Sequence, residues 1–164
     1  MPVEIERKFL VAGDEWRVQV TRSELFRQGY LATTGSCSIR VRVGGTSAWI
    51  SVKGRVTGMR RAEYEYEIPR AEANEILDTM CDEGRVEKYR HWVESGEREW
   101  EIDEFLGANA GLVVAELEIE SERAEFARPA WLGHEVTDDL RYYNASLAQL
   151  PWSSWAGGED GEGA

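Results

Sequence analysis

The sequence is poor in the side chains on which most metal and redox sites depend. Its 164 residues include two cysteines, Cys37 and Cys81, and two histidines, His91 and His134. The cysteines lie far apart, and neither C-x-x-C nor a Cys/His spacing suited to zinc is present. No Ser/His/Asp pattern accompanies the histidines. These absences argue against a structural zinc domain and a serine-type nucleophile, and they predict free thiols in a reducing compartment.

Long apolar runs are also missing. None approaches the length of a membrane span, and no charged segment followed by an apolar one precedes Glu4. We therefore expect a cytoplasmic protein without a membrane partner. The formal net charge of −12 argues against a nucleic-acid binder, which needs clustered Lys and Arg in excess. A small anionic ligand stays compatible with this charge, because the 19 basic residues can converge on one site.

The sequence contains enough apolar residues for one core. Hydrophobic residues make up 42% of the chain, with seven tryptophans and six tyrosines.

Most of the sequence is typical of short strands with alternating polar and apolar residues. Such strands are expected at 3–11, 25–31, 38–43, 47–53, 61–68, 85–93, 97–105 and 112–120. Helices or helical turns are expected at 13–18, from Pro69 to Gly84, at 121–131 and at 138–149, the last capped by Asp138 or Asp139. The Gly- and acid-rich segment 151–164 is expected to be a mobile tail.

The polar faces of these strands are almost purely ionic. Glu4 and Glu6 lie about 7 Å apart on one face of a strand, so they repel by roughly 2.4 kcal/mol at an effective dielectric near 20. A solvated face would remove most of this cost, and for one strand that is the simpler interpretation. The pattern recurs, however, and it segregates by strand. The acidic groups are Glu4/Glu6, Glu63/Glu65/Glu67, Glu101/Asp103 and Glu116/Glu118/Glu120, and the basic groups are Arg40/Arg42, Lys53 and Lys88/Arg90.

The opposite strand faces carry Val, Ile, Leu, Tyr and Trp, and the expected helices have too few apolar residues to form a bundle of their own. We therefore expect the helices to cover the apolar faces, with Tyr64 and Tyr66 packed beneath one of them. The sheet would then close into a β-barrel with a charged lumen. Interleaved basic strands offset part of the repulsion, and hard carboxylate oxygens select Mg²⁺ or Mn²⁺. A metal-bound polyphosphate suits such a lumen.

The ordered set of charged motifs resembles the CYTH, or triphosphate tunnel metalloenzyme, superfamily. The motifs are EIERK at 4–8, RVR at 40–42, Lys53, EYEYEI at 63–68, VEKYR at 86–90, EID at 101–103 and ELEIE at 116–120. The resemblance covers residues 1–150. It implies an α+β fold, a closed eight-stranded antiparallel tunnel with helices packed outside. It also implies a metal-dependent enzyme acting on triphosphates, and RQGYL, RVEK and LRYYN are most similar to the bacterial branch, which includes inorganic triphosphatases.

The resemblance also implies roles for individual residues. Carboxylates would bind the metal, and basic side chains would hold phosphate oxygens. The matching metal candidates are Glu4, Glu6, Glu63, Asp103, Glu116 and Glu118, and the substrate candidates are Lys8, Arg40, Arg42, Lys53, Arg61, Lys88 and Arg90. Either Lys88 or a carboxylate such as Glu4 or Glu6 would activate the attacking water. The sequence does not decide between them.

Several questions stay open at this point. A class IV adenylyl cyclase and a thiamine triphosphatase belong to the same superfamily, and a non-catalytic polyphosphate-binding module is a third alternative. The expected partner is a small anionic substrate, inorganic triphosphate or a nucleoside triphosphate. Arg141 is a further basic candidate near a tunnel mouth. Trp152 and Trp155 would either fold back over a mouth or meet another subunit, and the sequence leaves open whether the chain forms a homodimer.

Overall fold

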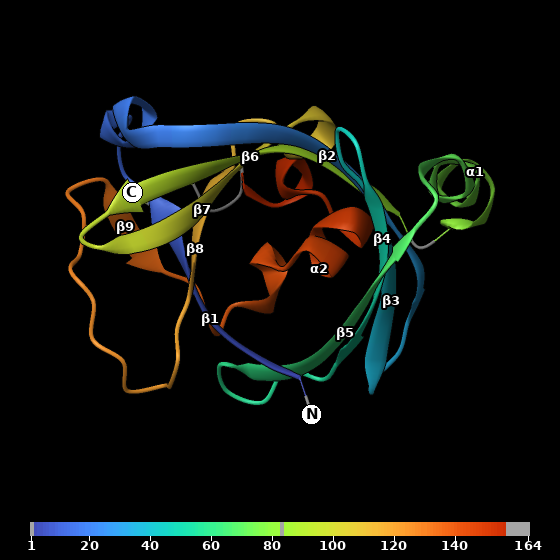
Figure 1. Cartoon of the computed structure of the whole chain (residues 1–164), viewed down its shortest axis with the longest axis horizontal. Coiled ribbons are helices and arrows are strands. Elements are labelled where there is room, and N and C mark those ends of the chain that lie inside the picture. Colours follow the sequence, from blue (N-terminus) through green and yellow to red (C-terminus); the bar gives the residue numbers. More distant parts are fainter. Residues whose placement is uncertain (1, 83, 157–164) are drawn as a thin grey trace.

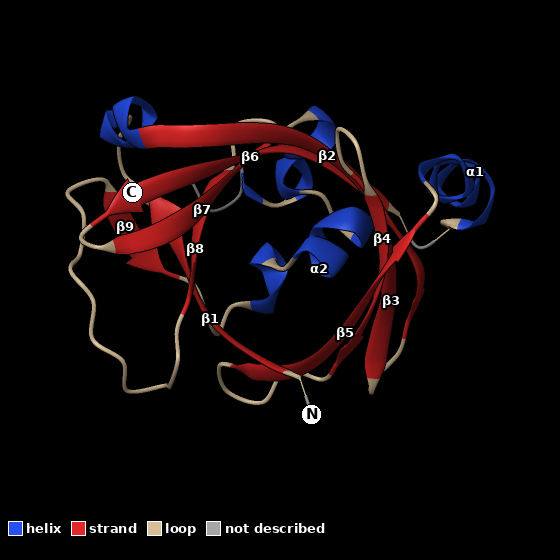
Figure 2. Cartoon of the chain, viewed as in Figure 1, coloured by secondary structure: helices blue, strands red, loops and turns tan. Residues whose placement is uncertain are grey.

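A computed structural model describes residues 2–82 and 84–156, which form one antiparallel sheet curled into a ring (Figures 1 and 2). The strand order is β5-β4-β3-β2-β6-β7-β8-β1-β9, and β1 also pairs with β5. The strands are β1 (Val3–Val11), β2 (Val20–Thr33), β3 (Cys37–Val43), β4 (Ala48–Gly54), β5 (Arg60–Ile68), β6 (Arg85–Ser95), β7 (Arg98–Phe105), β8 (Val113–Glu118) and β9 (Leu132–Glu135).

Strand β1 closes the ring. Residues Val3–Ile5 pair with β5, whereas Glu6–Leu10 pair with β8. The ring therefore closes through two short ladders at different heights of one strand, and β9 adds to β1 beyond them. The α+β ring of antiparallel strands agrees with the prediction. The sequence did not predict β9, because LGHE is short and shows no alternation.

The alternation that the sequence predicts for β3 is present. Val41 and Val43 are buried on the outer face, where they meet Ala73 and Leu77 of α1 (Arg70–Met80). Arg40 lies on the other face, inside the ring. α1 therefore covers the outer side of β2, β3 and β4, as expected for a helix packed outside. Among the described residues, no helix is long and apolar enough to cross a membrane.

A larger apolar cluster lies outside β1, β7 and β8, and it corrects one prediction. The helix expected at 121–131 is absent, and this segment has a turn at each end with irregular backbone between them. Ala124 and Phe126 pack against the cluster around Phe9 and Trp100, while Glu125 between them is exposed. This spacing of two residues between packed side chains does not fit the period of a helix, and Pro129 disfavours a helix here as well.

The helix expected at 138–149 is split into two. A 3₁₀ turn (Leu140–Tyr142) is followed by extended backbone at Tyr143 and then by α2 (Asn144–Gln149). Asp139 caps the turn by accepting a hydrogen bond from the Arg141 backbone N at 3.1 Å, as predicted. α2 corrects the expectation that helices lie only outside. Its first residues line the lumen, and α2 lies within the outline of the ring (Figure 1).

The interior position of α2 follows from its one deeply buried apolar side chain. Leu147 is fully buried in a cluster with Val86, Phe105 and Val114 near one end of the ring. Burial of a Leu side chain stabilises the fold by about 2 kcal/mol. The extended Tyr143 redirects the chain so that Asn144 can reach the lumen while Leu147 stays in the cluster.

The tryptophans beyond residue 150 pack on the same end of the ring. The Trp152 backbone N donates to Asn109 Oδ1 at 2.8 Å, and the Trp155 ring meets Tyr142 edge-on at 5.2 Å between ring centroids. The remainder of the predicted tail, 157–164, lies outside the described residues. Tyr64 and Tyr66 correct another expectation. They lie on the outer face of β5, but no described helix covers them, and 37% and 59% of their surfaces are exposed.

Gly84 provides a test of how α2 is seated. Its φ is +108°, and a Cβ at this position would lie 2.4 Å from the Ala148 carbonyl oxygen of α2. Gly107 is a matched control, because its φ is +62° but nothing lies within 4 Å of an added Cβ. We expect Gly107→Ala to cost about 1 kcal/mol of unfolding free energy and Gly84→Ala about 2–4 kcal/mol, measured by urea denaturation. Equal costs would show that α2 does not constrain Gly84.

Candidate active site

The lumen of the ring contains a cavity of about 440 Å³. Alternation places the ionic faces of the strands inward, as the sequence predicts. Of the predicted site residues, the cavity is lined by Glu4, Glu6, Lys8, Arg40, Arg42, Lys53, Arg61, Glu63, Lys88, Arg90, Glu116 and Glu118. Asp103 is buried behind this lining, and Arg141 lies elsewhere, paired with Asp139. The structure therefore brings the predicted site residues together, with Asp103 bound to two residues of the lining and Arg141 outside the group.

Asp103 joins the two basic side chains of β6. Its carboxylate accepts from Lys88 Nζ at 2.6 Å and from Arg90 Nε and Nη2 at 2.8 and 2.9 Å. Burial alone would raise the pKa of Asp103, but Arg90 and Lys88 lower it to about 2. Both carboxylate oxygens are thus engaged by cations. Asp103 was predicted as a metal ligand, whereas these contacts favour a role in holding Lys88 and Arg90.

Glu116 of β8 lies opposite Lys8 of β1 in the antiparallel register, and the two form a buried ion pair at 2.7 Å. Arg90 approaches the same carboxylate at 3.4 Å. Burial would raise the pKa of Glu116, but Lys8 and Arg90 hold it well below its usual range. Glu116 therefore stays ionised inside the lumen.

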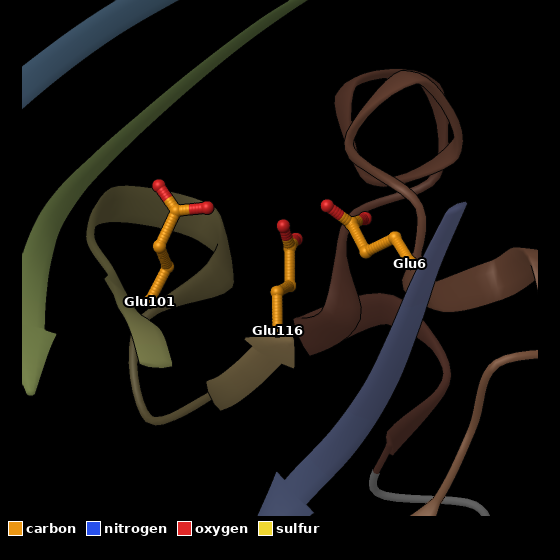
Figure 3. A group of neighbouring side chains, drawn as sticks. All are labelled: Glu6, Glu101 and Glu116. Atoms are coloured by element: carbon orange, nitrogen blue, oxygen red, sulfur yellow. The ribbon is translucent and has the colours of Figure 1, made fainter. Parts of the chain in front are cut away.

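Three carboxylates from different strands converge beside this pair. Oxygen atoms of Glu6, Glu101 and Glu116 all lie within 4.8 Å of one another (Figure 3). Burial, followed by the charges of Glu116 and Glu4, raises the pKa of Glu6 well above its usual range. Glu116 and Glu101 pair with Lys8 and Arg90, whereas Glu6 has no ion pair among the described residues. Hard carboxylate oxygens are the ligands that Mg²⁺ and Mn²⁺ prefer. The residues present therefore fit a divalent cation.

Sequence reasoning placed Glu101 on a charged face but did not select it as a ligand. Glu101 and Asp103 lie two residues apart on β7, so the alternation assigns both to the lumen. The register separates them, since Glu101 lies opposite Glu116, whereas Asp103 lies opposite Arg90 of β6. Without the register, nothing in the sequence shows which of the two faces other acids.

The remaining predicted acids form a more open group. Lys53 Nζ lies 3.5 Å from Glu4 and 3.1 Å from Glu63. Burial would raise the pKa of Glu4, but Lys53 and a hydrogen bond with Glu6 bring it below its usual value. The pKa of Glu118 is raised by burial and by the charge of Glu4. These acids extend the negative side of the lumen away from Glu116.

Two buried cations on the basic side of the lumen, Arg42 and Lys88, have lowered pKa values. Burial and the charges of Arg40 and Arg90 lower the pKa of Arg42 to about 9. Burial, with Arg90 and Arg42 acting against Asp103, lowers the pKa of Lys88 to about 7. The Arg42 guanidinium lies 4.6 Å from the centre of the Phe26 ring, which packs between Trp49 and Trp92. Phe26, Trp49 and Trp92 each lie two residues from Gln28, Ser51 and Arg90, so this aromatic cluster lies inside the ring beside the basic wall.

Two lining residues from the C-terminal region escaped sequence reasoning. Lys8 Nζ lies 4.9 Å from the centre of the Tyr143 ring, and Asn144 Oδ1 accepts from Lys88 Nζ at 2.9 Å. Both residues precede or begin a short helix, so strand alternation cannot place them. Glu65 of β5 also lines the cavity, 3.7 Å from Arg40; the alternation assigned it to the lumen, but it was not selected as a site residue.

Comparison with known proteins agrees with this geometry. Residues 2–149 match the CYTH domain family, which is most of the chain. The chain belongs to the CYTH family. An inorganic triphosphatase from Acetivibrio thermocellus is 46% identical over 155 residues, covering 94% of this chain and 99% of that protein. An inorganic triphosphatase from Nitrosomonas europaea is 39% identical over 153 residues, covering 88% and 96%.

A solved crystal structure leads to the same family. It is that of an inorganic triphosphatase with 36% sequence identity and a TM-score of 0.66, and the match covers 91% of this chain and 96% of that one. The predicted resemblance to the triphosphatase branch of the CYTH superfamily is thus confirmed. The CYTH match also extends over every cavity-lining strand and over α2.

The contacts of Asp103 predict its effect on stability. Asp103→Asn removes the ion-pair partner of the buried Lys88 and the carboxylate that binds Arg90 through two nitrogens. We therefore expect a loss of about 3–5 kcal/mol in unfolding free energy at neutral pH. Glu101→Gln is a control on the same strand, because the Glu101 side chain is 27% exposed and pairs with Arg90 at the edge of the cluster. We expect it to cost about 1 kcal/mol or less. Denaturant titrations of both variants measure the difference.

The contribution of Asp103 to the unfolding free energy should also depend on pH. The pKa of Asp103 is lower in the folded protein, at about 2, than the roughly 3.9 of an unfolded chain. Its contribution to stability is therefore complete above about pH 4 and is lost as the pH falls toward 2. Asp103→Asn should reduce this acid-dependent loss. If Asp103→Asn changed neither the acid transition nor the stability at neutral pH, Asp103 would not stabilise the fold through Lys88 and Arg90.

Proposed function

We propose that this chain hydrolyses inorganic triphosphate to pyrophosphate and phosphate with Mg²⁺ or Mn²⁺. The observation that carries the proposal is one cavity in which buried cations face a cluster of carboxylates. A polyphosphate needs cations along its length, and a divalent metal needs carboxylates beside it. The family relatives support the proposal, since two of them are inorganic triphosphatases that the chain covers almost completely.

The basic wall would bind the phosphate oxygens. Arg40 is the clearest example, because it is only 4% exposed, lines the cavity and has a buried Nε without a hydrogen-bond partner in the described part of the chain. A buried donor left unpaired costs about 1–3 kcal/mol, which a bound anion would recover. Arg42, Lys53, Arg61, Lys8 and Arg90 would extend the same surface.

Glu6, Glu101 and Glu116 would hold the metal, and Glu4, Glu63 and Glu118 would add negative charge around it. When bound, a divalent cation polarises phosphoryl oxygens and neutralises charge that develops on them. The protein supplies the orientation. The Lys8 and Arg90 contacts to Glu116 keep that carboxylate ionised and turned toward the cluster.

Lys88 is the group that we assign to the attacking water. Its Nζ donates to Asp103 and Asn144, and the side chain lines the cavity. With a pKa of about 7, a substantial fraction is neutral near physiological pH and can accept a proton. The carboxylates beside it are engaged by cations or grouped for a metal. The geometry therefore favours Lys88 over Glu4 or Glu6 as the base, a choice that the sequence left open.

The deciding experiment is phosphate release from inorganic triphosphate, ATP and thiamine triphosphate in parallel, with Mg²⁺, with Mn²⁺ and with EDTA. We expect fast release from inorganic triphosphate that EDTA abolishes. Formation of cyclic AMP and pyrophosphate from ATP would instead indicate a cyclase, and preference for thiamine triphosphate a thiamine triphosphatase. Binding of triphosphate without turnover would indicate a polyphosphate-binding module.

The metal assignment has its own pair of variants. Glu101→Gln should raise the Mn²⁺ concentration for half-maximal rate by about tenfold or more, because one ligand loses its charge. Glu104→Gln is the control, since Glu104 lies three residues later on β7 and bonds His91 and Arg17 outside the ring. It should leave the Mn²⁺ requirement unchanged. Equal metal requirements in the two variants would contradict the assignment of Glu101.

The assignment of Lys88 predicts a pH profile. The rate with inorganic triphosphate should rise as the pH passes through about 7, because only the neutral amine accepts the proton of water. Lys88→Arg keeps a positive charge that does not titrate, so it should lose about 100-fold in kcat or more and lack this rise. The substrate ionises identically in the assays of the wild-type chain and of Lys88→Arg, so it cannot cause a difference between the two pH profiles. A similar rise in Lys88→Arg would assign water activation to another group.

A further inference from the structure

A chain of neutral side-chain amides connects α2 with the basic wall of the lumen. Asn144 Oδ1 accepts from Lys88 Nζ at 2.9 Å and from Gln28 Nε2 at 3.1 Å. Gln28 Oε1 in turn accepts from Arg42 Nε at 3.0 Å. Gln28 is 1% exposed and Lys88 is fully buried. One amide oxygen of α2 is thus shared by donors from β2 and β6.

These contacts fix the direction of the Lys88 amine. A lysine nitrogen has three positions besides its bond to carbon, and two of them are used by donation to Asp103 at 2.6 Å and to Asn144. Because Lys88 also lines the cavity, the third position is the one left for a ligand or water there. Loss of either acceptor would free the amine to rotate.

The chemistry of the acceptors is as informative as their position. Lys88 already shares the carboxylate of Asp103 with Arg90, so its second acceptor can hold it without adding another negative charge, and the same holds for the amide beside Arg42. A carboxylate would pair with the cation and compete with phosphate. A side-chain amide oxygen accepts the hydrogen bond and stays neutral. Asp103 already supplies the one negative charge that Lys88 and Arg90 share.

We propose that Asn144 is a positioning residue that, together with Gln28, aims Lys88 at the reacting water without placing a second negative charge beside it. The proposal rests on the function proposed above. It gives α2 a role in the reaction, because Leu147 holds the helix in the apolar cluster and Asn144, one turn earlier, reaches the lumen from the same helix.

The test is a double-mutant cycle with Asn144→Ala, Lys88→Ala and the double variant, assayed with inorganic triphosphate and Mn²⁺. Asn144→Ala should lower kcat about tenfold or more and change KM less than about threefold, because Asn144 acts on the orientation of Lys88. In the Lys88→Ala background, Asn144→Ala should change the rate less than about twofold. If the two losses multiply instead, Asn144 does not act through Lys88 and the proposal fails.

A second variant separates positioning from support of the fold. Asn144→Asp keeps the size and the acceptor, so a purely structural Asn144 would tolerate it. We expect unchanged or higher stability but a loss of about tenfold or more in kcat at neutral pH, because the new charge pairs with Lys88. Wild-type kcat in Asn144→Asp would overturn the proposal, and it can be measured even where Lys88→Ala is too slow to assay.

Asn109→Ala is the matched control. Asn109 is also a buried amide, 3% exposed, but its oxygen holds the Trp152 backbone outside the lumen. Asn109→Ala should lower the unfolding midpoint and leave kcat and KM unchanged. A tenfold loss of kcat in this variant would show that the loss of any buried amide mimics Asn144→Ala, and it would overturn the proposal. If the wild-type chain turned over no triphosphate, the proposed function would fail. Wild-type turnover combined with losses that multiply in the cycle would instead overturn the role of Asn144 alone, so the two failures are distinguishable.

Discussion

The bridging of Lys88 and Arg90 by one buried carboxylate is the interaction on which the rest of the lumen depends. Each charge taken out of water costs several kcal/mol unless it is paired and hydrogen-bonded. Asp103 meets this requirement for two cations at once, with both oxygens engaged. Because Lys88 and Arg90 share this carboxylate, one anion positions both cations of β6. A separate carboxylate for each cation would offset more of the desolvation cost, but it would also weaken the attraction for a polyphosphate.

The ring imposes a second constraint, since its charged faces meet only if β1 is held in place. β1 contributes Glu6 and Lys8 to the lumen, and its outer side is braced by the segment around β9. The Lys8 backbone N donates to Thr137 Oγ1 at 3.0 Å, and Arg7 pairs with Glu135 at 2.5 Å. Thr137 Oγ1 also donates to that carboxylate at 2.6 Å. The same strand thus carries active-site groups on one side and a structural network on the other.

Period-two alternation was enough to predict the ring and the inward faces, because side-chain direction in a strand depends on local geometry alone. It could not give the register, and the register decides that Glu101 faces Glu116 while Asp103 faces Arg90. A helix was wrongly predicted at 121–131, where Ala124 and Phe126 both pack on the cluster around Trp100 with a spacing of two residues that a helix does not provide. Asn144 could not be found from sequence, since its place in the lumen depends on the break at Tyr143 and the burial of Leu147.

The charges on the two sides of the lumen are paired within the protein to different degrees, and this difference indicates where a ligand would bind. On the basic side, buried cations have acceptors within the protein, carboxylate for Lys88 and Arg90 and amide for Arg42. On the acidic side, Glu6 lies beside two other carboxylates, and burial together with the charges of Glu116 and Glu4 raises its pKa. A proton relieves that repulsion only by neutralising a ligand, whereas a divalent cation relieves it and adds charge next to the basic wall. A metal-bound polyphosphate would therefore stabilise both sides together, with its phosphates on the arginines and its metal on the carboxylates.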